Sequence, residues 1–107
     1  MNTSNEYLQF IIQKLDPLGD VKSRAMFGGY GIFYEGLMFA LISDDTLYFK
    51  VNESNRAIYE KAGSKPFPHG ISYWEVPADV LEEDGMLHNW AQISINISQQ
   101  AAKKKRK

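Results

Sequence analysis

Few side chains in this sequence have the types and spacing that catalysis or metal binding requires. The two histidines, His69 and His88, form no His-x-x-x-His pair, and no glutamate pattern completes a metal triad with them. Asp44 and Asp45 are adjacent carboxylates, but their position between two apolar runs is typical of a turn rather than an acid–base pair. The absence of cysteine excludes disulfides, cysteine-ligated zinc and thiol catalysis. We therefore predict no catalytic residues, no metal, no cofactor and no enzyme activity.

Arg24 is the charged residue whose position most needs an explanation. It stands among mostly apolar residues in an expected strand, where burying an unpaired guanidinium is costly. Glu75, in the segment "SYWEVP", is a possible carboxylate partner. We favour this structural ion pair over recognition of a partner or a ligand anion by Arg24.

Two adjacent glycines, Gly28 and Gly29, lie between two strand-like runs. Glycine at such a point usually permits a bulge or a corner with positive φ. An anion-binding loop is the alternative, but the Lys-Ser/Thr pair and the helix start that phosphate loops need do not follow. A pocket beside this corner gives the alternative function, either a small-molecule-binding domain or an enzyme.

Aromatic residues near this corner and in "SYWEVP" indicate a possible binding surface. Aromatic side chains dominate cores because they bury large areas, and they also anchor interfaces. We favour the core reading except for Tyr30 and Tyr73, whose hydroxyls suit an interface rim. A stacking platform for single-stranded nucleic acid is a third option, against which the acidic body argues. The candidate binding surface comprises Arg24, Phe27, Gly28, Gly29, Tyr30, Tyr73 and Trp74.

Charge is distributed unevenly along the 107 residues. The net charge is −1, but the final "KKKRK" holds five of the 12 basic residues, which leaves seven basic and 13 acidic side chains in residues 1–102. An acidic body is a poor match for a broad phosphate-binding face. Weak, non-specific DNA contact is therefore expected through the tail, with a solvated helix end as the equally weighted alternative. The tail consists of Lys103, Lys104, Lys105, Arg106 and Lys107.

Hydrophobic periodicity predicts the elements of the first half. A helix is expected over residues 3–16, where Thr3 and Glu6 have capping-box spacing. Consecutive antiparallel strands are then expected in the segments "VKSRAMF", "GYGIFYE", "LMFALIS" and "LYFKV". The alternation in "LYFKV" predicts that Leu47, Phe49 and Val51 face the core. The run "LMFALI" has no polar face, so it is either covered on both sides or part of a subunit contact.

The second half is predicted to add helices around one more strand. A short helix is expected within residues 52–63, with Ala57, Ile58 and Ala62 packed inward. The segment "ISYWEVP" is a further strand, and "ADVLEEDG" a helical turn. Asp84 is expected to cap a last helix that runs from Gly85 to about Ala102. Its core-facing residues would be Leu87, Trp90, Ile93 or Ser94, and Ile97.

This order of elements is α, three or four β, α, β, α, which predicts an α+β domain with an antiparallel sheet flanked by helices. We expect one domain over residues 1–102 and a basic tail over 103–107. The start of the chain has no secretory signal pattern, and the longest apolar run is too short to span a bilayer. A soluble cytoplasmic protein without membrane contact is therefore expected.

Three blocks of this sequence resemble the N-terminal domain of the TfoX/Sxy family of competence regulators. They are "RAMFGGYGIF" from Arg24 to Phe33, "GLMFALISDDTLYFKV" from Gly36 to Val51, and "SYWEVP" from Ser72 to Pro77. The closing helix with its basic end also resembles the family. The matching positions are Arg24, Met26, Phe27, Gly28, Gly29, Gly31, Tyr73, Trp74 and Pro77.

The resemblance implies a secretion-chaperone-like fold that is often dimeric, so a homodimer is expected. It also implies bacterial regulation of DNA-uptake competence genes together with the cyclic-AMP receptor protein, a transcription factor. Full-length regulators of the family carry a second domain of helix–hairpin–helix type, which this chain is not expected to contain. The leading hypothesis is therefore a non-enzymatic, protein-binding regulatory module.

Overall fold

The computed structural model describes residues 4–26, 28–68 and 72–105, so Phe27, His69, Arg106 and Lys107 lie outside the described residues. The elements in chain order are α1 (Asn5–Leu15), the 3-10 helix η1 (Asp16–Leu18), β1 (Val21–Met26), β2 (Gly29–Tyr34), β3 (Leu37–Ser43), β4 (Thr46–Lys50), α2 (Arg56–Lys61), β5 (Tyr73–Glu75), α3 (Ala78–Glu82) and α4 (Asp84–Lys105).

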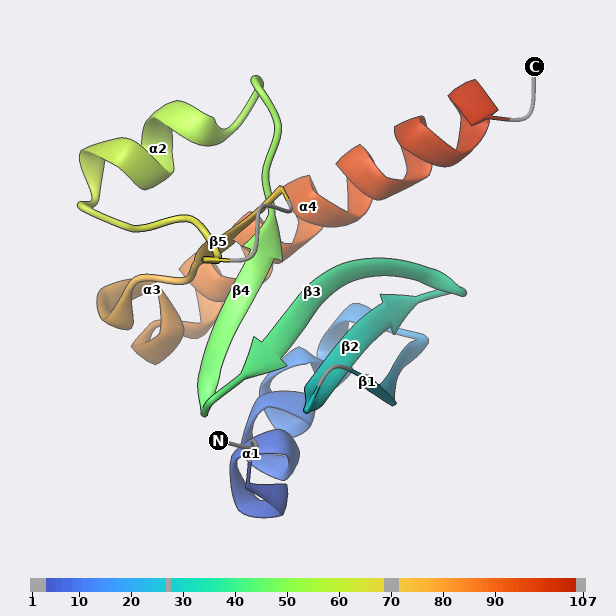
Figure 1. Ribbon diagram of the computed structural model, residues 1–107, viewed down its shortest axis with the longest axis vertical. Coiled ribbons are helices and arrows are strands. Elements are labelled where there is room, and N and C mark those ends of the chain that lie inside the picture. The colour runs from blue at the N-terminus through green and yellow to red at the C-terminus, as the bar shows by residue number, and fades with distance from the viewer. Residues whose placement is uncertain (1–3, 27, 69–71, 106–107) are drawn as a thin grey trace.

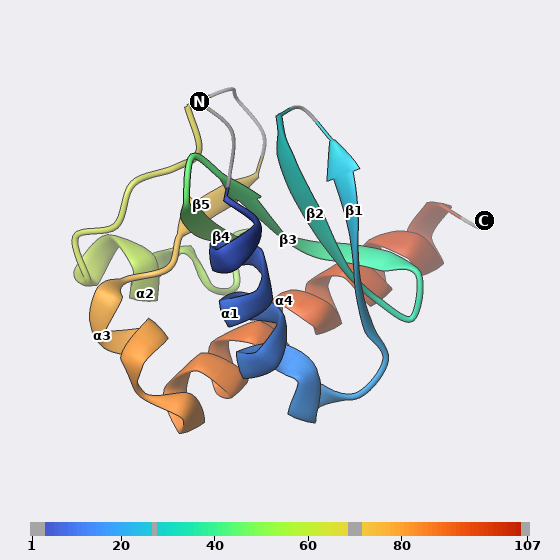
Figure 2. The ribbon, with the colours of Figure 1, turned by 90° about the horizontal axis from the view of Figure 1, so that it is seen from below.

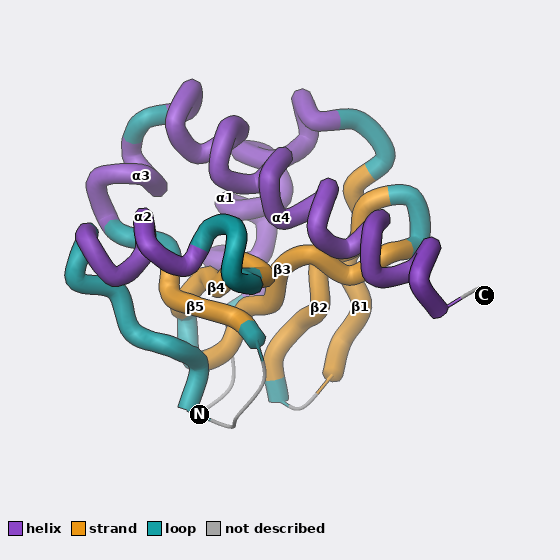
Figure 3. Tube along the Cα trace, turned by 90° about the horizontal axis from the view of Figure 1, so that it is seen from above, coloured by secondary structure: helices purple, strands orange, loops and turns teal. Residues whose placement is uncertain are grey.

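The strands form one antiparallel sheet with the order β1-β2-β3-β4-β5. Each strand therefore pairs with its neighbour in the sequence, and β1 and β5 are the two edges (Figure 2). The helices gather on one side of this sheet, which gives two layers (Figure 3). The predicted α+β class and the antiparallel sheet are confirmed.

Two-residue turns join the central strands. Glu35 and Gly36 have φ values of 48° and 85°, and Asp44 and Asp45 have φ values of 53° and 55°. Two successive positive φ values are the geometry that suits the twist of a tight hairpin. The Asp45 carboxylate also accepts a hydrogen bond from the Ser4 backbone N–H at 2.8 Å, which ties the start of α1 to the β3–β4 turn. The prediction that the two aspartates are turn residues is confirmed.

Two helix caps differ from the predictions by one residue each. Ser4 caps α1, since its hydroxyl accepts from the Tyr7 N–H at 3.1 Å, and the predicted cap Thr3 lies outside the described residues. The Glu83 carboxylate accepts from the Met86 N–H at 2.7 Å, so Glu83 rather than Asp84 caps α4. Each cap satisfies a backbone N–H that has no partner within its own helix.

The core lies between the sheet and α1, α3 and α4. Leu47, Phe49 and Val51 are all buried, as the alternation predicted. In β3 the pairing register shifts so that Ile32 faces Ala40 while Phe33 faces Met38, which leaves Phe39 as an extra residue. A β-bulge of this kind explains why Phe39 and Ala40 are adjacent in sequence and yet both belong to the core.

The apolar run of β3 is buried within a single chain. Phe39, Ala40 and Ile42 have exposed fractions of 0–1% and lie in the core, whereas Leu41 faces the opposite side of the sheet and is 6% exposed. The residues from Phe39 to Ile42 are therefore buried without a second subunit, whereas Leu37 and Met38 at the start of the run are half-buried. The burial gives no support to a subunit contact through β3.

Helix α2 packs through a residue that the periodicity did not single out. Tyr59 is fully buried, with its ring 4.7 Å from that of Trp90 between centroids. Ala57, Ile58 and Ala62, which were predicted to pack inward, are exposed. The prediction is wrong because α2 is six residues long and meets the core with one side chain near its middle.

Helix α4 is anchored to the sheet by two buried serines. The hydroxyls of Ser94 and Ser98 donate to the carbonyl oxygens of Lys50 and Met38, each at 2.7 Å. These bonds satisfy carbonyls at a strand end and next to the bulge, where the sheet ladder is interrupted. The helix continues to Lys105, three residues beyond the predicted end at Ala102, and extends away from the sheet (Figure 1).

The buried hydroxyl of Tyr59 gives the first testable prediction. Tyr59 Oη makes no hydrogen bond of good geometry within the described part of the chain, and the nearest polar group is Ser94 Oγ, which itself donates to the Lys50 carbonyl. An unsatisfied buried hydroxyl costs free energy, so Tyr59→Phe should leave the free energy of unfolding unchanged or raise it by up to about 1 kcal/mol. Urea unfolding at pH 7 measures this change.

The pH dependence of the same variant provides a second readout. Burial raises the pKa of Tyr59 from its ordinary value of 10, so in strong base the unfolded state loses this proton before the folded state does. The free energy of unfolding of the wild-type protein should therefore fall as pH rises above about 10. In Tyr59→Phe this fall should be less steep, because the variant lacks the buried hydroxyl. If Tyr59→Phe instead lowered the free energy of unfolding by about 1 kcal/mol or more at pH 7, the Tyr59 hydroxyl would have to make a stabilising hydrogen bond.

No helix within residues 4–26, 28–68 and 72–105 has the length and apolar character needed to cross a membrane.

Candidate functional site

The glycine corner is a structural feature of the β1–β2 connection. Gly28 has a φ of 75°, which permits the turn, and Gly29 is buried at the start of β2. A Cβ on Gly29 would overlap the carbonyl oxygen of Ile42 on β3, so this position needs a residue without a side chain. The predicted role of the pair as a corner is confirmed: Gly28 supplies the positive φ, and Gly29 allows the close approach of β3.

The predicted binding surface is divided between distant parts of the sheet. Arg24 lies on β1 opposite Gly31, and Tyr30 lies on β2, whereas Tyr73 and Trp74 lie on β5 at the other edge. β3 and β4 separate the two groups (Figure 2). The seven residues therefore do not form one continuous surface, and Phe27 lies outside the described residues.

Arg24 does not pair with Glu75. The two residues stand on opposite edge strands, and the side chain of Arg24 is exposed. Its guanidinium carbon lies 5.2 Å from the ring centroid of Phe33, a cation–π arrangement on the surface of the β1–β2 hairpin. The predicted buried ion pair is wrong. Arg24 lies on an edge strand with its guanidinium in water, so its charge needs no carboxylate partner.

The two residues on β5 have structural contacts. Tyr73 is 6% exposed, burial raises its pKa to about 12, and its hydroxyl donates to the Met38 carbonyl at 3.4 Å. An interface rim needs an accessible hydroxyl, so this reading of Tyr73 is wrong. Trp74 and Tyr30 are half-buried and pack against the core. Trp74 also borders a hollow of about 280 Å³ beside Arg56.

His88 is half-buried near the start of α4 rather than free on the surface. Its Nε2 lies 2.7 Å from the carbonyl oxygen of Lys14 near the end of α1. Lys14 also forms an ion pair with Asp84 at 3.1 Å, so both contacts join the two helices. Within the described ranges, no three His, Cys, Asp or Glu side chains gather as a metal site.

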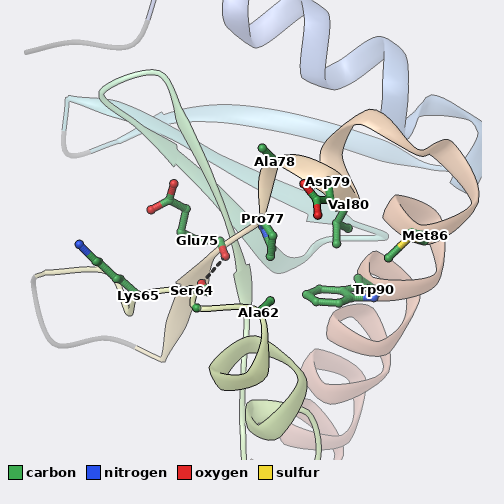
Figure 4. A pocket seen from close by; sticks show the side chains of 11 residues that line it. Ala62, Ser64, Lys65, Glu75, Pro77, Ala78, Asp79, Val80, Met86 and Trp90 are labelled. Carbon is green, nitrogen blue, oxygen red and sulfur yellow. Dashed lines mark hydrogen bonds between the residues drawn. The ribbon is translucent and has the colours of Figure 1, made fainter.

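A groove of about 510 Å³ lies where α2, the end of β5, α3 and α4 converge (Figure 4). We call it the α2–α4 groove. Gly63, with a φ of 76°, ends α2 and turns the chain along the groove, and the Ser64 hydroxyl then donates to the Glu75 carbonyl at 2.6 Å. The lining residues are Ala62, Gly63, Ser64, Lys65, Glu75, Pro77, Ala78, Asp79, Val80, Met86 and Trp90.

Most of the groove wall is apolar, and part of it is open to water. Met86 is 42% exposed, and Trp90 is half-buried with its inner edge against Tyr59. Methionine adapts to differently shaped partners, and tryptophan is enriched among residues that dominate binding energies. The wall therefore combines an adaptable residue with a rigid one that the core holds in place.

Charged side chains mark the borders of the α2–α4 groove. Lys65 and Glu75 lie at one end, and Met86 and Trp90 lie at the other (Figure 4). Asp79, in the first turn of α3, adds a second carboxylate. The groove therefore has a charged end and an apolar end, and protein interfaces likewise combine apolar area with polar groups.

Sequence reasoning missed this groove. Met86 comes just before Leu87, the first residue predicted to face the core from α4. The hydrophobic periodicity therefore does not distinguish Met86 from a core residue. Trp90 was assigned to the core, which is half correct, since one side of the ring contacts Tyr59. The structure shows that Met86 is exposed while the next residue, Leu87, is buried, a difference that the residue types alone did not indicate.

The basic tail begins as part of α4. Lys103 and Lys104 are exposed, and the helical backbone continues through Lys105. The remaining two cations of the tail lie outside the described residues. Successive helical positions point in different directions, so the described part of the tail spreads its charge around the helix end.

The sequence matches a known family model and is similar to other proteins. Residues 13–97 match the family model described as the TfoX N-terminal domain. The chain is 40% identical over 52 residues to the DNA transformation protein TfoX1 of Aliivibrio fischeri, which covers 49% of this chain and 25% of that protein. It is also 27% identical over 84 residues to an uncharacterized 12.7 kDa protein in the trpE 5' region of Spirochaeta aurantia, which covers 78% of this chain and 72% of that protein.

Proposed function

Because the chain belongs to the TfoX N-terminal domain family, we propose that it is a non-enzymatic regulatory domain that acts in DNA-transformation competence by binding a partner protein. The family membership confirms the resemblance seen in the sequence. The name of the relative in Aliivibrio fischeri supports the link to transformation, although the match covers a quarter of that protein. The site of action would be the cytoplasm, where competence genes are transcribed.

The observation that carries this proposal is the α2–α4 groove. Its wall presents exposed Met86 and half-buried Trp90, with charged residues at the border. Residues of these types bind proteins by burial of apolar area, at roughly 25 cal/mol per Å² removed from water. A transcription factor of the cyclic-AMP receptor protein type is the partner we propose, because this is the partner that the family resemblance implies.

Met86→Glu should weaken partner binding at least tenfold, because a carboxylate in the apolar wall would lose its hydration when the partner covers it. Isothermal titration calorimetry of the purified chain against a cyclic-AMP receptor protein measures the dissociation constant. Ile58→Glu is the matched control, since Ile58 is 37% exposed on α2 and does not line the groove. Wild-type protein that binds no such factor would contradict the proposed partner, and equal effects of both variants would contradict the groove.

We also propose a homodimer, on the family resemblance alone. The apolar run of β3 was a second reason for this expectation, but it is buried within one chain. Light scattering of the full chain determines the mass directly. A monomer at concentrations well above those in the cell would contradict the dimer and leave the proposed partner binding intact.

A further inference from the structure

One face of the sheet bears no helix within the described ranges. The helices gather on the side where Leu47 and Phe49 enter the core (Figure 3). Side chains alternate along a strand, so Tyr48, which lies between these two residues, points to the opposite side. We call this opposite side, with Tyr48 and the residues level with it in the other strands, the open face.

A single row of residues crosses the open face from one edge of the sheet to the other. In the pairing register its members follow one another strand by strand as Arg24, Gly31, Leu41, Tyr48 and Glu75. Cross-strand partners lie on the same face of a sheet, so the whole row belongs to the open face. The row begins with a cation on β1 and ends with a carboxylate on β5, four strand spacings or about 19 Å away.

The β1 end of the row is positive. β1 and β2 contain Lys22 and Arg24 and no acidic residue. Lys22 is paired with Asp20 at 3.8 Å, whereas Arg24 is exposed and has no ion-pair partner among the described residues. Arg24 therefore carries the uncompensated charge at this end.

The β5 end of the row carries the exposed Glu75, whose charge is uncompensated although two lysines are near. The Lys50 ammonium lies 5.6 Å from the ring centroid of Tyr73, and the Lys65 carbonyl accepts from the Glu75 N–H at 2.9 Å. Neither lysine forms an ion pair with Glu75 in the described part of the chain. The Glu75 carboxylate also points away from Trp90, at the apolar end of the α2–α4 groove (Figure 4).

Between its charged ends the row is apolar. Leu41 lies in the middle and is 6% exposed. Gly31 has no side chain, and the space beside it is occupied by Met26 Sδ and Phe33 Cε1, each 3.1 Å from where a Cβ would stand. Tyr48, on the other side of Leu41, is half-buried. Apolar area between charged ends is a composition that protein interfaces share.

A second copy can stack on the open face with two-fold symmetry in two ways. If the symmetry axis runs across the strands, β1 lies over β1 of the second copy, and the two Arg24 side chains repel each other. If the axis runs along β3, Leu41 meets its own equivalent, and β1 of each copy lies over β5 of the other. This second arrangement places Arg24 over Glu75 twice, so the face is complementary to itself.

We propose that two copies of the chain associate through their open faces in the second arrangement, with Arg24 of each copy paired to Glu75 of the other. The inference rests on the homodimer proposed above and adds the face, the axis and the two ion pairs. Packed sheets stand about 10 Å apart with their strands crossing at about 30°, so long side chains at the edges can bridge them.

Charge reversal tests this arrangement by analytical ultracentrifugation of the full chain. Arg24→Glu and Glu75→Arg should each weaken the dimer about tenfold or more, because each places two pairs of like charges across the interface. The double variant Arg24→Glu/Glu75→Arg should restore the dissociation constant to within about threefold of the wild-type value. Such a rescue cannot arise inside one chain, because the two residues stand on opposite edges of the sheet.

Lys61→Glu is the matched control, since it makes the same change of charge at an exposed position on α2. It should change the dissociation constant by no more than about twofold, and weakening as large as that of Arg24→Glu would overturn the interface. A wild-type dimer that the single variants leave intact, or that the double variant fails to restore, would also overturn it while the homodimer stands. A monomeric wild type would instead overturn the homodimer, and this arrangement with it.

Cross-linking gives a second test, because the sequence contains no cysteine to interfere. Chains with Arg24→Cys and chains with Glu75→Cys are mixed and treated with a short bismaleimide. We expect a cross-linked dimer from the mixture and none from either variant alone, since only unlike positions face each other. A cross-link with Arg24→Cys alone would indicate stacked β1 strands and overturn the proposal, as would a dimeric mixture that forms no cross-link.

Discussion

Gly29→Ala should lower the free energy of unfolding by about 3 kcal/mol or more, because it forces a methyl group into the backbone of the neighbouring strand. The Cβ would overlap the carbonyl oxygen and carbon of Ile42, which belong to a paired central strand and cannot rotate away as a side chain can. Relief would require β2 and β3 to separate at this point. The strain is steric, since positive φ is found at Gly28 and not at Gly29.

Gly31→Ala is the matched control in the same strand. Its Cβ would lie 3.1 Å from Met26 Sδ and from Phe33 Cε1, which are ends of side chains that can move. We expect a loss below about 1.5 kcal/mol for this change. Thermal unfolding followed by circular dichroism should show a drop on the order of 15 °C for Gly29→Ala and a much smaller drop for Gly31→Ala. Similar melting temperatures for the two variants would contradict the close approach of β2 and β3.

Phe49→Ala should destabilise the protein by about 3–5 kcal/mol, the range for removing a fully buried aromatic side chain. Phe49 is 0% exposed in the middle of β4, and its ring lies 6.1 Å from that of Phe39 between centroids. The cavity would open at the centre of the core, where neighbours on α4 are held by their own helix and cannot close it. A loss of this size is a large fraction of the total stability of a small domain.

Phe10→Ala makes the same truncation at a residue that is 45% exposed on α1. Its contacts are the ring of Tyr7, 6.1 Å away, and the ammonium of Lys14, 5.3 Å away. We expect a cost below about 1 kcal/mol, because exposed contacts of this kind are weak. Urea unfolding of both variants measures the difference, and a cost for Phe10→Ala approaching that of Phe49→Ala would show that Phe10 is buried in solution.

The α2–α4 groove would bind a protein through apolar area, so its affinity should change little with salt.

Local features of the fold followed directly from the sequence. The turns at Asp44–Asp45 and Glu35–Gly36 and the alternation of Leu47, Phe49 and Val51 depend on neighbouring residues, so the sequence pattern was sufficient to predict them. The corner at Gly28 is equally local, because it depends on the conformational freedom of one residue. The order of strands and helices, and with it the α+β class, follows from these local signals.

The errors concern pairs of residues far apart in the chain. Arg24 and Glu75 looked like partners in sequence, but strand order puts them on opposite edges of the sheet. The burial of Tyr59 in place of Ile58 depends on where the six-residue α2 settles against Trp90, which its own periodicity does not determine. Tyr73 likewise became buried because its side chain reaches Met38 across β4.

The sequence by itself determined the class of the domain, its turns, its acidic body and basic end, and the family to which it belongs. Tertiary structure alone decided where the α2–α4 groove forms, because the groove joins segments that are distant in the chain. Ala62, just after α2, and Met86, on α4, both line it. The physical reason is that local propensity acts over a few residues, whereas a binding surface depends on packing among whole elements.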